Sequence, residues 1–438
     1  MYGKRVTWGM VKTKSKESLF LIFLKNFFLL FAFRGVGILT TATVNIIAGR
    51  NLSVEMWGQF NTIFSLSNFL VIPLIMGVNN SLLKILPESS PEKREEITGT
   101  VVIGNIALCL LFSIIGFLLT PAACMLFRNI TPTSWHLAIC FAVATNACIV
   151  TETFLKINEK FSRLGIARMT GGIVLLTSTI IFISFSENFS SNIFVMLNIM
   201  SQFLIFLISV FRRKRVKIAF HWSAVRAIFK VSAMYMLSWM LGTGLNYADV
   251  FIISALRNSY EIGIFNGYQV NVRGYFSAFY YDIFAAVLLP TLINHGGDLK
   301  KLVKTVIKFL PVVFAVLSGG TIVVILGLLF AYGSKYPVVW SYILLEAAGI
   351  AFQGIYYFFS SLLVTEGQEG ARASLEFMGK PFLLLIAIIL FFTWNFGLLG
   401  TFISFTVNQG ILAALMIFHY YRKNRRGESG VISQTDAG

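Results

Sequence analysis

Six ionisable side chains interrupt stretches of the sequence that are otherwise apolar. They are Arg34, Glu152, Asp249, Arg273, Asp282 and Glu346. A guanidinium in apolar surroundings can bind phosphate oxygens through two parallel hydrogen bonds, and a carboxyl group can carry a proton or bind a sodium ion. If these stretches cross a membrane, each charge costs about 3 kcal/mol at the bilayer centre unless it faces protein or water. These residues are therefore the first candidates for a functional site.

Arg273 differs from the others because polar side chains surround it at helical spacing. It lies about ten residues into a predicted helix, or roughly 15 Å deep. Asn266, Gln269 and Ser277 flank it at intervals of three and four residues, which on a regular helix places all four side chains in one stripe. Asp282 follows nine residues later and therefore points to the opposite face. We predict that the stripe lines a binding cavity and that Arg273 is its cation.

Other interpretations of the same charges stay open. Arg273 could instead form a structural ion pair with Asp249 or Glu346, which both lie in the outer half of their predicted spans. Arg34 lies near the start of the first predicted span, where its guanidinium could line the cavity or extend to the inner surface. For Asp249, Asp282 and Glu346, coupling to protons or sodium and pairing with basic groups are equally compatible with the sequence.

The remaining reactive side chains show no pattern typical of catalysis or of metal binding. The cysteines are Cys109, Cys124, Cys140 and Cys148, and the histidines are His136, His221, His295 and His419. Neither set has the spacing of a zinc site or of a metalloprotease helix, and a Walker lysine motif is absent. Glu152 precedes Lys156 by four residues, which is compatible with a local ion pair. We predict no enzyme activity, no metal and no cofactor beyond a coupling ion.

The elements that must position these residues are transmembrane helices. The chain has 438 residues, of which 56% are hydrophobic and 13% charged, and its mean hydropathy is +0.77. Soluble domains are about half apolar and a quarter charged, so this composition indicates an integral membrane protein. Apolar runs of about 20 residues recur along the whole chain, and each can cross about 30 Å of hydrocarbon. The lengths predict an all-α membrane protein with about twelve transmembrane helices.

The net charge of +17 would suit a nucleic-acid-binding protein, but its distribution favours a membrane protein. Of the 36 lysines and arginines, two lie in predicted spans and four lie in one set of alternate loops. The other 30 lie in the two termini and the opposite loops. This asymmetry places both termini in the cytoplasm by the positive-inside rule. The basic linker over residues 212–228 is then an anchor that contacts lipid headgroups, and nucleic acid is not a predicted partner.

The chain also repeats a short motif at the start of two predicted helices. The first copy, Arg50 to Asn61, reads RNLSVEMWGQFN, and the second, Arg257 to Asn266, reads RNSYEIGIFN. Both share Arg-Asn, a glutamate and Gly-x-Phe-Asn, and they fall at the same place in each half. Parallel repeats of this kind predict two six-helix bundles around a central cavity. The predicted parts are an N-terminal half (1–211), the linker (212–228), a C-terminal half (229–421) and a cytoplasmic tail (422–438).

Two longer stretches carry a resemblance to a known family. Residues 52–88, LSVEMWGQFNTIFSLSNFLVIPLIMGVNNSLLKILPE, resemble the second span of Wzx-type polysaccharide (O-antigen) flippases. Residues 248–270, ADVFIISALRNSYEIGIFNGYQV, are similar to the segment at the seventh and eighth spans of that family. These flippases belong to the multidrug/oligosaccharidyl-lipid/polysaccharide exporter superfamily.

The resemblance implies a flippase of the bacterial inner membrane that uses alternating access. Its substrate would be an undecaprenyl-diphosphate-linked oligosaccharide repeat unit, moved to the periplasmic leaflet for O-antigen or similar surface polysaccharide. Its partners would be membrane lipids, a polysaccharide polymerase and the chain-length machinery. Arginines in spans one and eight of related lipid II flippases face the central cavity, and Arg34 and Arg273 occupy comparable places. Lipid II flippases usually have more spans than this chain can hold, which counts against that identity.

Three other functions remain as alternatives. An ion-coupled multidrug or cation antiporter of the same superfamily would favour an acidic cavity, for which Asp249 and Glu346 are candidates. A membrane polymerase or acyltransferase usually needs a long outer loop or a histidine-centred site, and the predicted outer loops are short. A scaffolding protein would need neither repeated halves nor charges inside its spans. The two arginines favour an anionic cargo.

Overall fold

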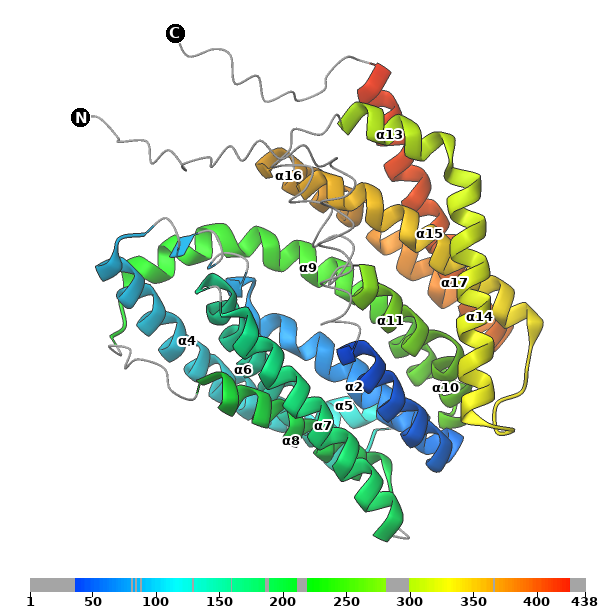
Figure 1. Ribbon diagram of the computed structural model, residues 1–438, viewed down its shortest axis with the longest axis horizontal. Coiled ribbons are helices and arrows are strands. Elements are labelled where there is room, and N and C mark those ends of the chain that lie inside the picture. Colours follow the sequence, from blue (N-terminus) through cyan, green and yellow to red (C-terminus); the bar gives the residue numbers. More distant parts are fainter. Residues whose placement is uncertain are drawn as a thin grey trace.

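The computed structural model describes residues 36–79, 82, 85–86, 89–127, 130–158, 160–185, 189–210, 219–280, 299–364 and 367–425. Within these ranges every regular element is a helix, as Figure 1 shows. The predicted all-α class is confirmed. The predicted limits of the two halves stay predictions, because residues 211–218 and 426–438 lie outside the described ranges.

The helices follow one another with short connections. The described chain begins with a helix over residues 36–51, followed by α2 (Val54–Ile75), α4 (Pro91–Leu118), α5 (Thr120–Leu126), α6 (Pro132–Ile157), α7 (Phe161–Phe185) and α8 (Ser191–Val210). The second part contains α9 (Trp222–Leu256), α10 (Ser259–Phe265), the π-helix η1 (Asn266–Val270), α11 (Asn271–Phe279), α13 (Leu299–Lys308), α14 (Leu310–Tyr332), α15 (Trp340–Val364), α16 (Gly367–Gly379) and α17 (Phe382–Arg425). Ser53 and Asn258 cap α2 and α10 with their side-chain oxygens, as short polar residues commonly do.

Eight helices among the described residues are long and apolar enough to cross a membrane. Seven of them correspond to α2, α4, α6, α7, α8, α14 and α15, and the eighth, Arg372–Arg422, covers the end of α16 and most of α17. The helix over 36–51, the apolar part of α9 (Met240–Leu256) and the continuous run from α10 to α11 supply three further passes. With α17 counted as two, the predicted number of about twelve passes is reached.

Helix α17 is a hairpin of two transmembrane arms. Gly397 breaks it with φ 60° and ψ −138°, a conformation open mainly to glycine. The Oγ1 atoms of Thr393 and Thr401 lie 3.1 Å apart across this break, and Asn408 Nδ2 donates to the carbonyl oxygen of Leu385 at 3.0 Å. Both pairs are centred on the same point of the chain, so the arms run antiparallel. The turn coincides with the predicted connection between the last two spans.

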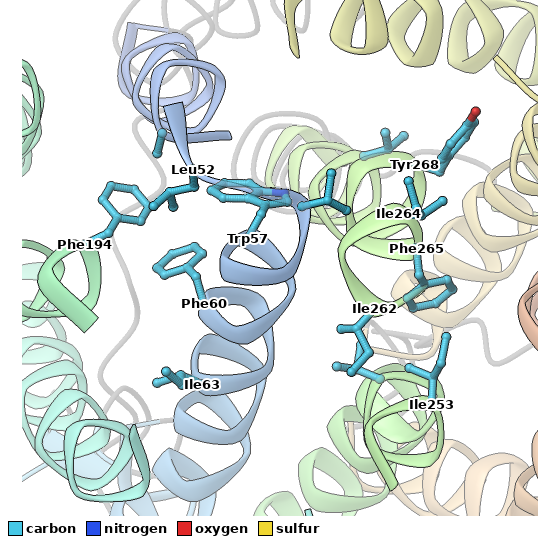
Figure 2. Packing of buried hydrophobic residues seen from close by; sticks show 14 of the residues in the cluster. Leu52, Trp57, Phe60, Ile63, Phe194, Ile253, Ile262, Ile264, Phe265 and Tyr268 are labelled. Carbon is cyan, nitrogen blue, oxygen red and sulfur yellow. The ribbon is translucent and has the colours of Figure 1, made fainter. Parts of the chain in front are cut away.

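The helices form two groups that meet along α2, α9 and α10. In Figure 1, α4, α6, α7 and α8 lie on one side, α13 to α17 lie on the other, and α9 runs between them. One buried apolar cluster joins the groups, and Figure 2 shows its side chains from α2, α8 and α10, among them Trp57, Phe194 and Phe265. A second cluster lies within the C-terminal group. Burial of these aromatic rings supplies much of the packing energy between the groups.

Helix α2 is shorter than predicted. The apolar pattern predicted one span to Asn80, but the helix ends at Ile75, and Met76 and Gly77 adopt positive φ values of 47° and 68°. Pro73 lies inside the last turn and cannot donate the usual backbone hydrogen bond. Asn105 Nδ2 of α4 donates to the carbonyl oxygen of Leu74 at 3.5 Å, so a neighbouring helix contacts the backbone exposed by the break.

Two segments predicted as cytoplasmic loops form helices. These are α13, which begins in the predicted loop after residue 293, and α16, which begins in the predicted loop after residue 364; both extend past the predicted ends of these loops. In α13 the side chain of Val303 is buried and those of Val306 and Ile307 pack against the C-terminal cluster, while Lys304 and Lys308 are exposed. Apolar length alone does not detect such short amphipathic helices, although their apolar residues recur at helical spacing.

Candidate functional site

The guanidinium of Arg273 lies in a buried polar site between α9, α11 and α17. Its Nη2 forms an ion pair with Asp249 Oδ2 of α9, and its Nη1 donates to the carbonyl oxygen of Asn246 at 3.1 Å. The guanidinium also lies over the ring of Phe405, 4.3 Å from its centroid. The two charged side chains are only 9% and 4% exposed. The ion pair with Asp249, one of the interpretations left open by the sequence, is present in the structure, and the cavity-lining role of Arg273 stays a prediction.

A second carboxyl group, Glu346 of α15, lies close to this pair. Its side chain is 0% exposed, and neither carboxyl oxygen has a hydrogen-bond partner among the described residues. It is near enough to interact electrostatically with both Arg273 and Asp249. Phe405 packs tightly on α15 at Gly349, where a Cβ atom would collide with the ring. The site therefore holds two buried carboxyl groups and one guanidinium, which of the two is bonded to Asp249 only. Burying the second carboxyl group as an unpaired charge would be strongly unfavourable.

A hydroxyl and two amide groups extend the site toward α15. The Tyr357 hydroxyl lies 3.2 Å from Ser277 Oγ of α11 and accepts a hydrogen bond from Gln353 Nε2 at 2.9 Å. Asn246 also hydrogen-bonds to this tyrosine. Gln353 lies seven residues after Glu346, two helical turns on and on the same face. The network fixes α9, α11 and α15 around the arginine.

The predicted polar stripe is interrupted by a π-helix. Asn266 and Gln269 both lie in η1, where the backbone turns are wider than in an α-helix, so the assumption of regular α-helical spacing is wrong here. Both side chains are 0% exposed, and their amide groups have no hydrogen-bond partner within the described chain. An unpaired buried amide costs about 1–3 kcal/mol, and π-helical turns are frequent at functional sites.

Contacts with the turn between α14 and α15 stabilise the π-helix. The Tyr268 hydroxyl donates to the carbonyl oxygen of Pro337 and accepts from the amide of Val339 at 3.0 Å. Gly267 lies against the ring of Tyr336, where a Cβ atom would be 2.8 Å from a ring carbon. These contacts come from residues about 70 positions away, and no local pattern in η1 indicates them.

The other predicted residues lie elsewhere. Arg34 and Asp282 fall outside the described residues. Glu152 is buried on α6, and its two carboxylate oxygens accept from Arg168 of α7 at 2.7 and 2.6 Å. Its bidentate partner is therefore on the next helix and is not Lys156, the local partner considered from the sequence. This pair lies in the N-terminal group, away from Arg273.

Comparison with known proteins identifies the family. The profile of the polysaccharide biosynthesis protein family matches residues 47–348, which is more than half of the chain. The chain belongs to this family. No curated protein matches the sequence. The matched region of this polysaccharide biosynthesis protein includes Asp249, Arg273 and Glu346.

Solved structures with the same fold are membrane transporters. The lipid II flippase MurJ in an inward closed conformation has a TM-score of 0.66 and 16% identity, covering 90% of this chain and 87% of that chain. An inward-facing multidrug resistance MATE family transporter has a TM-score of 0.63 and 15% identity, covering 96% and 100%. A transporter from Pyrococcus furiosus, described as having a binding pocket of reverse polarity, has a TM-score of 0.55 and 13% identity, covering 94% and 97%.

At these identities the structures show the fold and not the substrate. They share the fold of the multidrug/oligosaccharidyl-lipid/polysaccharide exporter superfamily. The family match and the fold together confirm the predicted resemblance to its polysaccharide flippases. This polysaccharide biosynthesis protein is therefore a multi-pass membrane protein with a transporter fold.

Proposed function

We propose that the protein is a flippase for undecaprenyl-diphosphate-linked oligosaccharide repeat units, used to make O-antigen or a similar surface polysaccharide. The observation that carries the proposal is a polysaccharide biosynthesis sequence on a transporter fold. The distribution of basic residues supports a location in the bacterial inner membrane with both termini in the cytoplasm. The flipped unit would pass to a polysaccharide polymerase and its chain-length machinery. The related structures are transporters, so we infer that the protein is not an enzyme.

In this proposal Arg273 is the cation that meets the diphosphate. A guanidinium binds phosphate oxygens in a bidentate manner, and its Nε has no partner among the described residues. Asp249 holds the side chain in place through its ion pair. Asn266 and Gln269 would add hydrogen bonds from the same segment, and Arg34 would add a second cation from the first span.

Coupling to protons or sodium belongs to the same proposal. A diphosphate that draws Arg273 away leaves Asp249 as an unpaired buried carboxylate, which is strongly unfavourable unless it takes up a proton or a cation. Glu346 already lies beside the pair without a hydrogen-bond partner in the described chain. Asp282 is a further candidate for this role from its place in the sequence.

The test is export of surface polysaccharide in a strain whose own copy of the gene is deleted. Arg273→Ala should abolish export while the protein remains in the membrane at the normal level. Arg273→Lys should restore only part of it, because a lysine lacks the planar fork of an arginine. Arg226→Ala, which removes an exposed arginine from α9 far from the site, is the matched control and should export normally. Full export by Arg273→Ala would refute the role of this residue.

A second function, ion-coupled export of cationic drugs, is favoured by one observation. The site holds two carboxyl groups and one guanidinium, so a cationic molecule could balance the excess. Overexpression should then raise resistance to cationic dyes, and Glu346→Gln should abolish that resistance. A flippase for an anionic lipid should leave resistance unchanged.

A further inference from the structure

Helix α13 is a short helix with one basic side and one apolar side. Its ten residues, LKKLVKTVIK, contain four lysines and no acidic residue. Counted at about 100° a residue, the four lysine positions fall within an arc of roughly 100°, and the apolar positions fall on the other side of the wheel. An isolated helix of this length is not stable in water. The stability of α13 must therefore come from the packing of its apolar side.

The apolar side of α13 packs on the C-terminal group of helices. Val303 is 3% exposed and belongs to the second buried cluster, and Val306 and Ile307 pack against that cluster. The helix contacts α14 and α17, and Figure 1 shows it beside the last turns of α17. Phe309 separates it from α14 with φ −95° and ψ 10°, and Pro311 lies in the first turn of α14, where its missing amide hydrogen costs nothing. The lysine side of α13 therefore faces away from the group.

The exposed lysines of α13 have no acidic partner in the described part of the chain. Lys304 and Lys308 are exposed, and neither forms an ion pair there. By contrast, the exposed Lys380, which follows α16, pairs with Glu376 at 2.7 Å. Two like charges four residues apart on a helix repel each other and destabilise it. The two lysines of α13 therefore weaken the helix unless an anion from outside the chain binds them.

An exposed apolar ridge on α14 begins next to these lysines. Phe309, Val312 and Val316 are 50%, 58% and 67% exposed and follow one another at spacings of three and four residues, so they lie in one row. Because α14 is long and apolar enough to span a membrane, exposed apolar side chains on it meet acyl chains. The Lys308 Nζ lies 5.7 Å from the centroid of the Phe309 ring. A cation thus lies at the end of a surface that faces acyl chains.

We propose that Lys304 and Lys308, together with the ridge from Phe309 to Val316, bind an anionic phospholipid on the cytoplasmic side of the membrane. The headgroup phosphate meets the two ammonium groups, and one acyl chain lies along the ridge. The predicted loop that contains the start of α13 is one of those that hold 30 of the 36 lysines and arginines, which favours the cytoplasmic side. A free phosphate ester would match the lysines and leave the ridge without a ligand. The lipid site depends neither on transport nor on the proposed cargo.

Calorimetric titration of the purified full-length protein with dioctanoyl phosphatidylglycerol tests the proposal. Lys304→Gln/Lys308→Gln should weaken binding about 25-fold, because each lysine near an anionic surface contributes about fivefold. Binding of dioctanoyl phosphatidylcholine, which has the same chains and no net charge, should not change. Lys304→Arg/Lys308→Arg should bind like the wild type. The matched control is Lys380→Gln, which removes an exposed lysine that already has a carboxylate partner and should bind normally. Equal binding of the anionic lipid by the wild type and the double glutamine variant would overturn the proposal.

Competition experiments identify the occupant of the site. Glycerol phosphate, which has a phosphate and no acyl chain, should not displace the bound lipid, and displacement at equal concentration would replace the lipid by a free phosphate ester. Displacement by a polyprenyl phosphate at a much lower concentration would overturn the choice of phospholipid and assign the site to a lipid carrier. Unchanged lipid binding by the double glutamine variant, together with loss of polysaccharide export in cells, would make α13 a docking site for a protein. Because the readout is binding, failure of the proposed function would leave the lipid site intact.

Discussion

Replacing Arg273 alone should destabilise the protein more than replacing it together with Asp249. Arg273→Met leaves the Asp249 carboxylate buried without its cation, and breaking a buried ion pair in this way costs about 3–5 kcal/mol. In the double variant Arg273→Met/Asp249→Asn no charge of the pair remains. Methionine can still pack on the Phe405 ring, which now lies 4.3 Å from the guanidinium. We expect the double variant to be more stable than the single one by at least about 2 kcal/mol.

The measurement is the free energy of unfolding of the purified proteins in one detergent, followed by tryptophan fluorescence. Asp249→Asn alone completes the cycle and should also be destabilising, because it leaves the guanidinium partly unpaired. If Arg273→Met is no less stable than the double variant, burying the Asp249 carboxylate without Arg273 has no measurable cost. That result would refute the electrostatic reasoning. Measuring export of the same variants distinguishes a structural role of Arg273 from a role in anion binding. A stable double variant that exports nothing supports anion binding by Arg273, and one that exports normally assigns this arginine a structural role only.

A substitution of the second buried carboxyl group, that of Glu346, tests its role in coupling. Glu346→Gln keeps the shape of a buried side chain that has no partner in the described chain; it should change the free energy of unfolding by less than about 1.5 kcal/mol. It should nevertheless abolish any dependence of export on the proton or sodium gradient, and a variant that keeps this dependence would exclude Glu346 as the coupling group.

The sequence predicts the transmembrane passes, and it names Asp249 among the possible partners of Arg273. Both predictions follow from the requirements of burial. A run of about 20 apolar residues has few stable structures besides a spanning helix. A buried arginine needs an acidic partner, and few lie within reach, which is why Asp249 was among the predicted partners of Arg273. The repeated motif marks the starts of α2 and α10 because cap residues and glycines have local structural requirements.

The features that were missed depend on contacts between distant parts of the chain. Phe405 contacts Arg273, and Tyr357 contacts Ser277, from helices that are 80 or more residues away in the sequence. The π-helix depends on Tyr268 bonding to the turn after α14. No local pattern distinguishes it from an α-helix, so the predicted stripe of Asn266 and Gln269 assumed the wrong spacing.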